Sequence, residues 1–181
     1  MAALSDIALI AQVVTFGSER AFSQLVKAHQ EAVRRFLRRL TAGDEMRADD
    51  LAQETFIRAW QHLSSFRQLS GFETWLMRIA YHVFLDDERR NVHLASLDSC
   101  TQQSPSQTGG DGGWAIHHDL DLALATLSES ERTCVILQCM EGQSIKDISG
   151  ITGIPENTVK SHLLRGKKNL ANYLRKNGYN G

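Results

Sequence analysis

Two short apolar repeats, separated by Gly153 and Pro155, constrain the fold of this chain more than any other feature. Isoleucines recur at helical spacing over 145–151, and Ser144 stands before them as a helix cap. Gly153 suits the left-handed backbone that ends a helix, and Pro155 suits the first turn of the next helix. The sequence over 143–170 therefore predicts two helices joined by a tight turn, a helix-turn-helix.

The second helix of this motif divides into an apolar face and a polar, basic face. Val159, Leu163 and Leu170 share the apolar face. The residues expected to contact DNA are Asn157, Thr158, Lys160, Ser161, His162, Leu164, Arg165, Lys167 and Lys168. Lys and Arg far outnumber the single acid, Glu156, in this part of a chain whose net charge is only −1. Such local positive charge suits a phosphate backbone, and side chains near the helix start reach base edges in the major groove. Alternatively, these lysines and arginines could merely solvate the outer face of a terminal helix. That interpretation would explain the positive charge but not the turn at Gly153 and Pro155.

Length and composition narrow the remaining classes of protein. At 181 residues, with 42% hydrophobic and 23% charged residues, the chain suits one mid-sized or two small soluble domains. It contains neither a run of about 18 apolar residues nor a basic start followed by a short apolar core. A cytoplasmic protein without a membrane span of its own is therefore expected.

The cysteines do not suggest a disulfide framework or a zinc site. Cys100, Cys134 and Cys139 are odd in number and include no Cys-x-x-Cys pair, so reduced thiols are expected. His117 and His118, with Cys100, are the alternative ligand set, or the basis of a hydrolase, but a flexible glycine-rich stretch separates them. No metal, no cofactor and no enzymatic activity are expected.

The periodicity along the chain predicts an all-α protein with two small helical domains. Two prolines in the whole chain and the scarcity of alternating β-branched runs argue against strands. Helices are expected over 4–16 (with Ile7, Ile10 and Val14 inward), 19–41, 48–63 and 71–90, and after a capped start at Ser128–Glu131. The polar, glycine-rich stretch 98–113 is typical of a linker. The expected domains are residues 1–95 and 119–181, with the linker over 96–118 and structure resuming at Asp119.

Three motifs of the first domain resemble those of bacterial sigma factors. The segment Asp49–Trp60 is similar to the helix of that family that binds core RNA polymerase, and Phe72–Ala80 is similar to its promoter-melting helix. With Gly17–Phe22 before them, they resemble the extracytoplasmic-function group of the sigma-70-type family, which keeps only sigma regions 2 and 4. The resemblance covers nearly the whole chain except the linker.

The resemblance implies the partners and the roles of individual residues. Region 2 would bind the coiled coil of the clamp of the largest polymerase subunit through the outward side of helix 48–63, by Asp49, Asp50, Gln53, Glu54, Ile57 and Arg58. The loop 66–71 and the next helix would capture a base flipped from the −10 element, by Phe66, Arg67, Gln68, Trp75, Arg78 and His82. From spacing alone, a place in the core is the better assignment for both Trp75 and Phe72. The helix-turn-helix of region 4 would read the −35 element.

The resemblance also implies control by a partner, and the sequence departs from the family pattern at the promoter-melting helix. An anti-sigma protein that covers both domains is expected, and it can hold the chain at the membrane. Tyr81 and His82 are bulkier than in relatives, and Asp87 and Glu88 place acids where relatives are apolar or basic. An unusual −10 preference and weaker backbone affinity are therefore expected. The alternative function is that of a homodimeric helix-turn-helix repressor or activator, which leaves Asp49–Trp60 unexplained.

Overall fold

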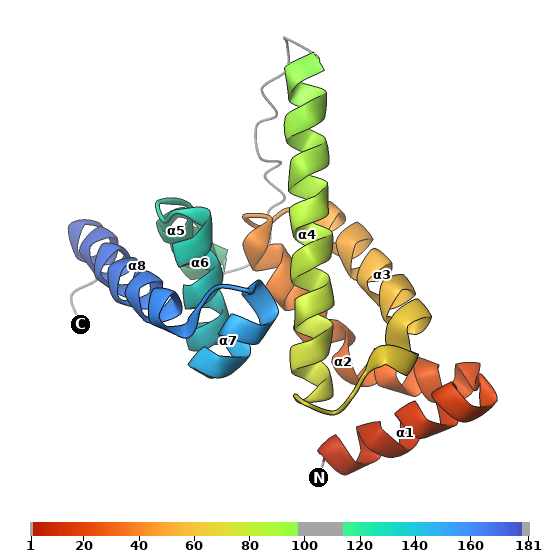
Figure 1. Ribbon diagram of the computed structural model, residues 1–181. Helices are drawn as coiled ribbons and strands as arrows, with labels where there is room; N and C mark the ends of the chain where they lie inside the picture. The colour runs from red at the N-terminus through yellow and green to blue at the C-terminus, as the bar shows by residue number, and fades with distance from the viewer. Residues whose placement is uncertain (1, 98–113, 179–181) are drawn as a thin grey trace.

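Every regular element in the described part of the protein is helical, which confirms the all-α prediction. The computed structural model describes residues 2–97 and 114–178 (Figure 1). The first group of elements is α1 (Ala2–Phe16), α2 (Glu19–Leu40), α3 (Glu45–His62), the 3-10 turn η1 (Leu63–Ser65) and α4 (Phe72–Leu97). The second group is α5 (Trp114–Ala125), α6 (Glu129–Val135), the π-helical turn η2 (Ile136–Met140), α7 (Ile145–Thr152) and α8 (Glu156–Lys176).

Helices α2, α3 and α4 form the core of the first domain, and α1 packs along α2 (Figure 1). Phe36 and Leu37 of α2 and Leu76, Met77 and Phe84 of α4 are at most 1% exposed. Burial of such large apolar side chains from adjacent helices is the main stabilising contribution to this domain. The domain therefore holds α3 and the start of α4, which carry two of the expected sites, in fixed positions.

The inward face of α1 differs from the prediction. Ile10 is buried as expected, but Ile7 and Val14 are 38% and 50% exposed, and Val13 is buried instead. Asp6 lies on the buried face as well, where its carboxylate is 3.1 Å from Nε2 of His29. Because α1 is apolar nearly all round, its hydrophobic periodicity did not select a unique face.

Three helix boundaries also differ from the prediction. Helix α3 begins at Glu45 rather than at 48, because the carboxylate of Asp44 accepts a hydrogen bond from the Arg47 amide and caps it. Helix α4 continues to Leu97, and α5 begins at Trp114 rather than at Asp119, so both helices extend into the stretch assigned to the linker. The glycine-rich centre of that stretch, with Cys100, and the side chains of the two neighbouring histidines lie outside the described residues.

The second domain is built on a close approach of α8 to α6. A Cβ atom added at Gly166 of α8 would lie 2.8 Å from Cγ2 of Val135, so only glycine fits without displacement. Ser128 and Glu131 form the expected capping box at the start of α6. After α6 the chain widens into the π-helical turn, where the Glu141 amide donates to the Ile136 carbonyl at 3.2 Å.

The two domains pack against each other. Helix α7 lies against α4 (Figure 1), and the Thr74 hydroxyl of α4 donates to the Gln143 side chain at 3.2 Å. The carboxylate of Glu141 accepts hydrogen bonds from Arg35 and Arg39 of α2. The sequence pattern of two domains and a linker does not predict such contacts, because they join residues that are far apart in the chain.

Candidate functional site

The helix-turn-helix forms as predicted. The Ser144 hydroxyl accepts a hydrogen bond from the Asp147 amide at 3.1 Å and caps α7. Gly153 ends that helix in the left-handed conformation, with φ +75°, and Pro155 occupies the position just before α8. Ile148 of α7 and Val159 of α8 are fully buried between the helices and the rest of the domain. Local capping and turn chemistry therefore fix the angle at which α8 leaves the domain.

Helix α8 presents its predicted DNA-contacting residues to solvent. Val159, Leu163 and Gly166 face the core. The exposed residues are Asn157, Thr158, Lys160, Ser161, Leu164, Arg165, Lys167 and Lys168, and His162 is half-buried. Leu164 is 74% exposed in the middle of this basic face. An apolar side chain among lysines and hydroxyls suits a major groove, where it can contact the methyl group of thymine.

Two of these cations also contact their own domain. Nε of Arg165 lies 3.5 Å from a carboxylate oxygen of Glu131, and Nη2 lies 3.3 Å from Nδ1 of His162. Nζ of Lys167 donates to the side-chain oxygen of Gln138 at 2.7 Å. Binding to DNA would exchange these contacts for base or phosphate contacts, at a small cost because the Arg165 and Lys167 side chains are exposed and contacts of exposed cations contribute little.

A second candidate site is an apolar groove between α2 and α3. It has a volume of about 560 Å³ and is lined by Phe22, Val26, Gln30, Arg34, Asp49, Ala52, Gln53, Phe56, Ile57 and Trp60. Phe22 and Trp60 meet edge to face, with ring centroids 4.9 Å apart. At the rim, Arg34 donates two hydrogen bonds of 2.7 Å to the Asp49 carboxylate. An apolar floor with a charged rim is the arrangement of a protein-docking surface.

The groove accounts for half of the residues predicted to bind polymerase. Asp49, Gln53 and Ile57 line it, and Ile57 is 46% exposed. Asp50, Glu54 and Arg58 do not line it. Arg58 instead donates at 2.8 Å to Glu54 and at 2.8 Å to Asp86 of α4, and this contact lowers the pKa of Asp86.

The sequence interpretation missed the α2 side of the groove. Phe22 and Val26 were expected in the core, and Trp60 was expected inward, yet Trp60 is 38% exposed and forms part of the groove. Helical spacing assigns a residue to a face but not to the edge of a face. The signal that could have shown the groove is the surplus of aromatic residues on the neighbouring faces of two adjacent helices.

A third candidate site is the loop 66–71 with the start of α4. Phe66, Phe72 and Trp75 form a cluster of three rings. The ring centroid of Phe66 lies 5.6 Å from that of Phe72 and 5.5 Å from that of Trp75, and the centroids of Phe72 and Trp75 are 5.7 Å apart. Phe72 is buried, whereas Phe66 and Trp75 are half-buried. Arg67 and Gln68 are exposed, and Gln68 has a positive φ of 55°. The loop therefore presents polar side chains above an aromatic floor, and Phe66 belongs to that floor.

Arg78 and His82 extend this site along α4. They are one helical turn apart and exposed, on the side of the helix that also carries Trp75. Desolvation, and then the nearby Arg78 guanidinium, lower the pKa of His82. At neutral pH the imidazole is therefore uncharged, and it can donate and accept hydrogen bonds at a base edge.

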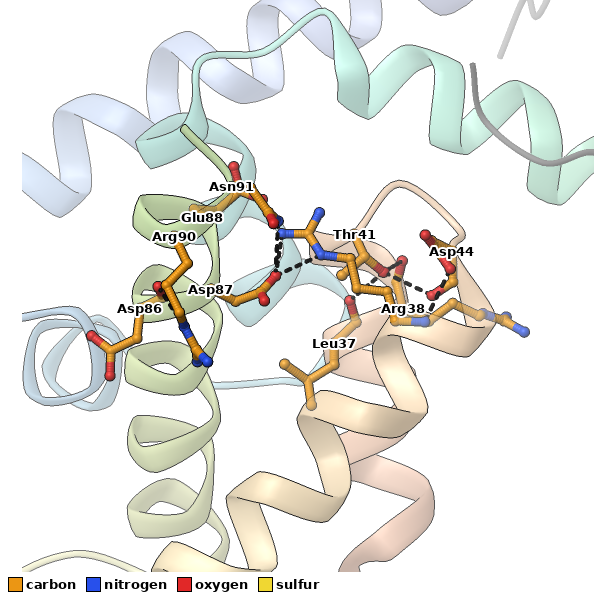
Figure 2. A network of polar contacts seen from close by, with 10 residues as sticks. Leu37, Arg38, Thr41, Asp44, Asp86, Asp87, Glu88, Arg90 and Asn91 are labelled. Carbon is orange, nitrogen blue, oxygen red and sulfur yellow. Dashed lines mark hydrogen bonds and ion pairs between the residues drawn. The ribbon is translucent and has the colours of Figure 1, made fainter. Parts of the chain in front are cut away.

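The acids further along α4 are paired within the protein rather than free. Arg47 of α3 donates to the carboxylates of Asp87, at 2.7 Å, and Glu88. Figure 2 shows Asp87 and Glu88 facing the turn between α2 and α3, and Asn91 donates to Asp87 at 3.2 Å. The expected repulsion of DNA by these acids is therefore reduced, because the guanidinium neutralises part of their charge.

The thiols and candidate metal ligands show no arranged centre in the described residues. Across 2–97 and 114–178, no group of three His, Cys, Asp or Glu is placed to hold a metal ion. Cys134 is buried, which raises the pKa of its thiol to about 11, and Cys139 is exposed. No helix in the described ranges is long and apolar enough to cross a bilayer.

Comparison with known proteins places these surfaces in one family. The Sigma-70 region 2 family matches residues 25–93, and the Sigma-70 region 4 family matches residues 117–170. The first range holds the aromatic loop and every residue that lines the groove except Phe22, and the second range holds the helix-turn-helix. The fold and sites thus define a sigma-70-type transcription factor with two regions.

Comparison with individual relatives shows to which group of this family the chain belongs. The ECF RNA polymerase sigma factor SigC of Mycobacterium tuberculosis is 32% identical over 85% of this chain and 83% of its own length. SigE of Mycolicibacterium smegmatis, also an ECF RNA polymerase sigma factor, is 34% identical over 86% of this chain, which spans 62% of that protein. The sigma factor RpoE of Bartonella quintana, solved with the anti-sigma factor NepR, has a TM-score of 0.72 at 27% identity over 85% of this chain and 96% of that one. This chain belongs to the ECF sigma factors, which direct RNA polymerase to promoters.

Proposed function

We propose that the chain divides the work of promoter recognition among its three surfaces. The α2–α3 groove binds the clamp coiled coil of core RNA polymerase, the exposed face of α8 reads the −35 element, and the loop 66–71 captures a base of the −10 element. The observation that carries the proposal is that one chain presents an apolar docking groove, a basic recognition helix and an aromatic loop. The protein acts by binding, without a chemical step, where the polymerase works in the cytoplasm.

The groove is the surface best suited to polymerase. Docking on a coiled coil requires apolar side chains flanked by charges, and Ile57 and Trp60 supply the apolar part while Arg34 and Asp49 supply the charges. Asp50 and Glu54, on the neighbouring outer surface of α3, extend the acidic rim.

The aromatic loop is suited to holding a melted base. Extrusion of a base costs a few kcal/mol, and stacking on an aromatic ring returns about 1–3 kcal/mol per base. Phe66 and Trp75 are each partly exposed, so an unstacked base can contact one ring while Arg67 or Gln68 bonds its edge. Capture therefore offsets much of the cost of extruding that base, without ATP.

An anti-sigma protein is the proposed regulator. The related sigma factor of Bartonella quintana was solved in a complex of that kind. A partner that covers the α2–α3 groove would exclude polymerase, and an anchored partner would hold this chain at the membrane.

The test is transcription in vitro with purified core polymerase and a promoter library. Ile57→Glu should abolish polymerase binding, whereas Glu31→Gln, on the exposed side of α2, should not. Arg165→Ala should relax preference within the −35 element by about 1–3 kcal/mol at one position. Phe66→Ala should slow melting without changing −35 preference. Failure of the wild-type chain to direct initiation with core polymerase would refute the proposal.

The alternative function, that of a homodimeric regulator, can be distinguished from the proposed function by the stoichiometry of the complex on DNA. A repressor or activator binds a duplex operator tightly as a dimer by itself. The proposed function predicts a monomer whose specific promoter binding depends on core polymerase, which gel-shift assays and analytical ultracentrifugation can measure.

A further inference from the structure

A carboxylate and an imidazole are buried together between α1 and α2. Asp6 and His29 are each 8% exposed, and Oδ2 of Asp6 lies 3.1 Å from Nε2 of His29. Removing such groups from water costs much of what their attraction returns, so a buried pair of this kind contributes more to geometry than to stability. The other inward residues of α1, Ile10 and Val13, are apolar. The stability of the domain alone therefore does not account for the pair.

The same imidazole contacts the aromatic floor of the loop 66–71. The rings of His29 and Phe72 meet edge to face, with centroids 5.2 Å apart and an interplanar angle of 75°. The centroid of Phe72 in turn lies 5.6 Å from that of Phe66 and 5.7 Å from that of Trp75. The imidazole is thus in direct contact with the buried ring on which both half-buried rings of the floor pack.

The hydrogen bond to Asp6 fixes the rotation of the His29 ring. The terminal torsion of a histidine side chain has a broad, roughly two-fold preference, so packing alone selects the plane of the ring weakly. A carboxylate that accepts from one ring nitrogen selects one orientation of the ring and requires a proton on that nitrogen. Because edge-to-face packing depends on the angle between two ring planes, the orientation of His29 restricts that of Phe72.

Helix α1 also supports the start of the loop 66–71. It packs along α2 and against η1, the turn that immediately precedes the loop. Leu63 of η1 is 2% exposed, and its carbonyl accepts a hydrogen bond of 3.1 Å from the Phe66 amide. In Figure 1, α1 lies at the end of the domain where the chain passes from α3 to α4. Helix α1 therefore supports the loop at both ends, at Phe66 through η1 and at Phe72 through His29.

We propose that Asp6 and His29 are positioning residues for capture of the −10 base: Asp6 holds the imidazole against Phe72, and Phe72 keeps Phe66 and Trp75 at the spacing that receives a base. The inference rests on the proposed function, because it requires that the loop captures a base. A floor that is already ordered in the free protein need not be ordered when the base arrives, so the base binds more tightly. Both side chains are buried, so they act through the rings rather than on the base.

The test replaces the pair by apolar residues and measures capture of the base. The apolar variant, Asp6→Leu with His29→Leu in the full chain, removes the hydrogen bond and the ring contact without leaving a buried charge unpaired. Its thermal unfolding midpoint should therefore be no lower than that of the wild type. With core polymerase, a single-stranded −10 oligonucleotide carrying 2-aminopurine should bind about tenfold more weakly, because one stacked base contributes a factor of about 5 to 150. Binding to core polymerase and to −35 duplex should not change.

Two further variants separate positioning from stability. Asp6→Asn keeps a side-chain hydrogen bond to the imidazole and should retain most of the affinity for the oligonucleotide. Leu40→Val opens a small cavity in the buried face of α2, about three turns and about 16 Å along the helix from His29. It should lower the unfolding midpoint without lowering the affinity for the oligonucleotide.

Weaker capture by the apolar variant, with unchanged polymerase binding, supports the positioning role. Equal capture by the apolar variant and the wild type overturns it. A loss of capture in Leu40→Val or Asp6→Asn as large as that in the apolar variant overturns it as well, and so does a parallel loss of polymerase binding.

Failure of the proposed function gives a different result. If the wild-type chain with core polymerase does not prefer a −10 oligonucleotide over a scrambled one, the proposed function of the loop fails. NMR relaxation of labelled phenylalanine and tryptophan rings in the free chain still tests the positioning role. Faster ring motion in the apolar variant than in the wild type supports that role, and equal ring motion overturns it.

Discussion

The close approach of α8 to α6 at Gly166 gives the sharpest stability prediction. A Cβ atom at Gly166 would lie 2.8 Å from Cγ2 of Val135 and 3.4 Å from the Glu131 carbonyl oxygen. Ordinary contact requires Val135 to retreat by about 0.6 Å, but this β-branched side chain is fully buried and stiff. Overpacking of this kind costs about 1–3 kcal/mol, and the better helix propensity of alanine returns up to about 1 kcal/mol. We therefore expect Gly166→Ala to destabilise the domain by about 1–2 kcal/mol.

Gly150 provides a matched control in the same motif. It lies inside α7, and a Cβ atom there would meet nothing within 4 Å. Only the propensity effect remains, so Gly150→Ala should stabilise the protein by about 0.5–1 kcal/mol. The same substitution thus has opposite signs at two positions of one helix-turn-helix.

Thermal and urea unfolding of the two variants measure both effects. A change of 1 kcal/mol shifts the midpoint by about 2–4 °C in a protein of this size. Gly166→Ala should also weaken −35 binding, because α8 must move away from α6. The packing argument is wrong if Gly166→Ala proves as stable as Gly150→Ala.

Three single side chains give further predictions. In a Cys100→Ser background, a thiol reagent at pH 8 should label Cys139 within minutes and Cys134 only after unfolding, because burial keeps the latter protonated; equal labelling rates would contradict this. Ser144→Ala should cost about 1 kcal/mol in urea unfolding by removing the cap of α7, and no change would show that the cap contributes nothing. Arg47→Met should cost about 1–2 kcal/mol, and less at high salt, because it leaves two acids of α4 unpaired; a loss independent of salt would point to packing instead.

The elements that the sequence predicted correctly are those determined locally. The cap at Ser144, the left-handed Gly153 and the buried Val159 depend on neighbouring residues, so spacing and turn chemistry were sufficient. The same holds for the capping box at Ser128. The exposed, basic face of α8, which we propose contacts DNA, was predicted because its periodicity is strong and its charge is local.

The features that sequence analysis missed depend on contacts between distant segments. The α2–α3 groove requires Phe22 and Trp60 to be adjacent, and spacing within each helix places both inward. Likewise, nothing local shows that Arg47 neutralises Asp87, or that Glu141 is buried against another domain. In α1 the uniform apolarity removed the signal itself, so Ile7 was placed on the wrong face.

The widened turn over Ile136–Met140 makes the link between domains sensitive to chain length. Its carbonyl–amide bond from Ile136 to Glu141 spans one residue more than an α-helical bond. Deletion of one residue there would restore regular α-helical winding and shorten the path from α6 to the helix-turn-helix by one residue. A single codon lost from this stretch would therefore alter the contact between the two domains while leaving intact the side chains proposed to contact DNA.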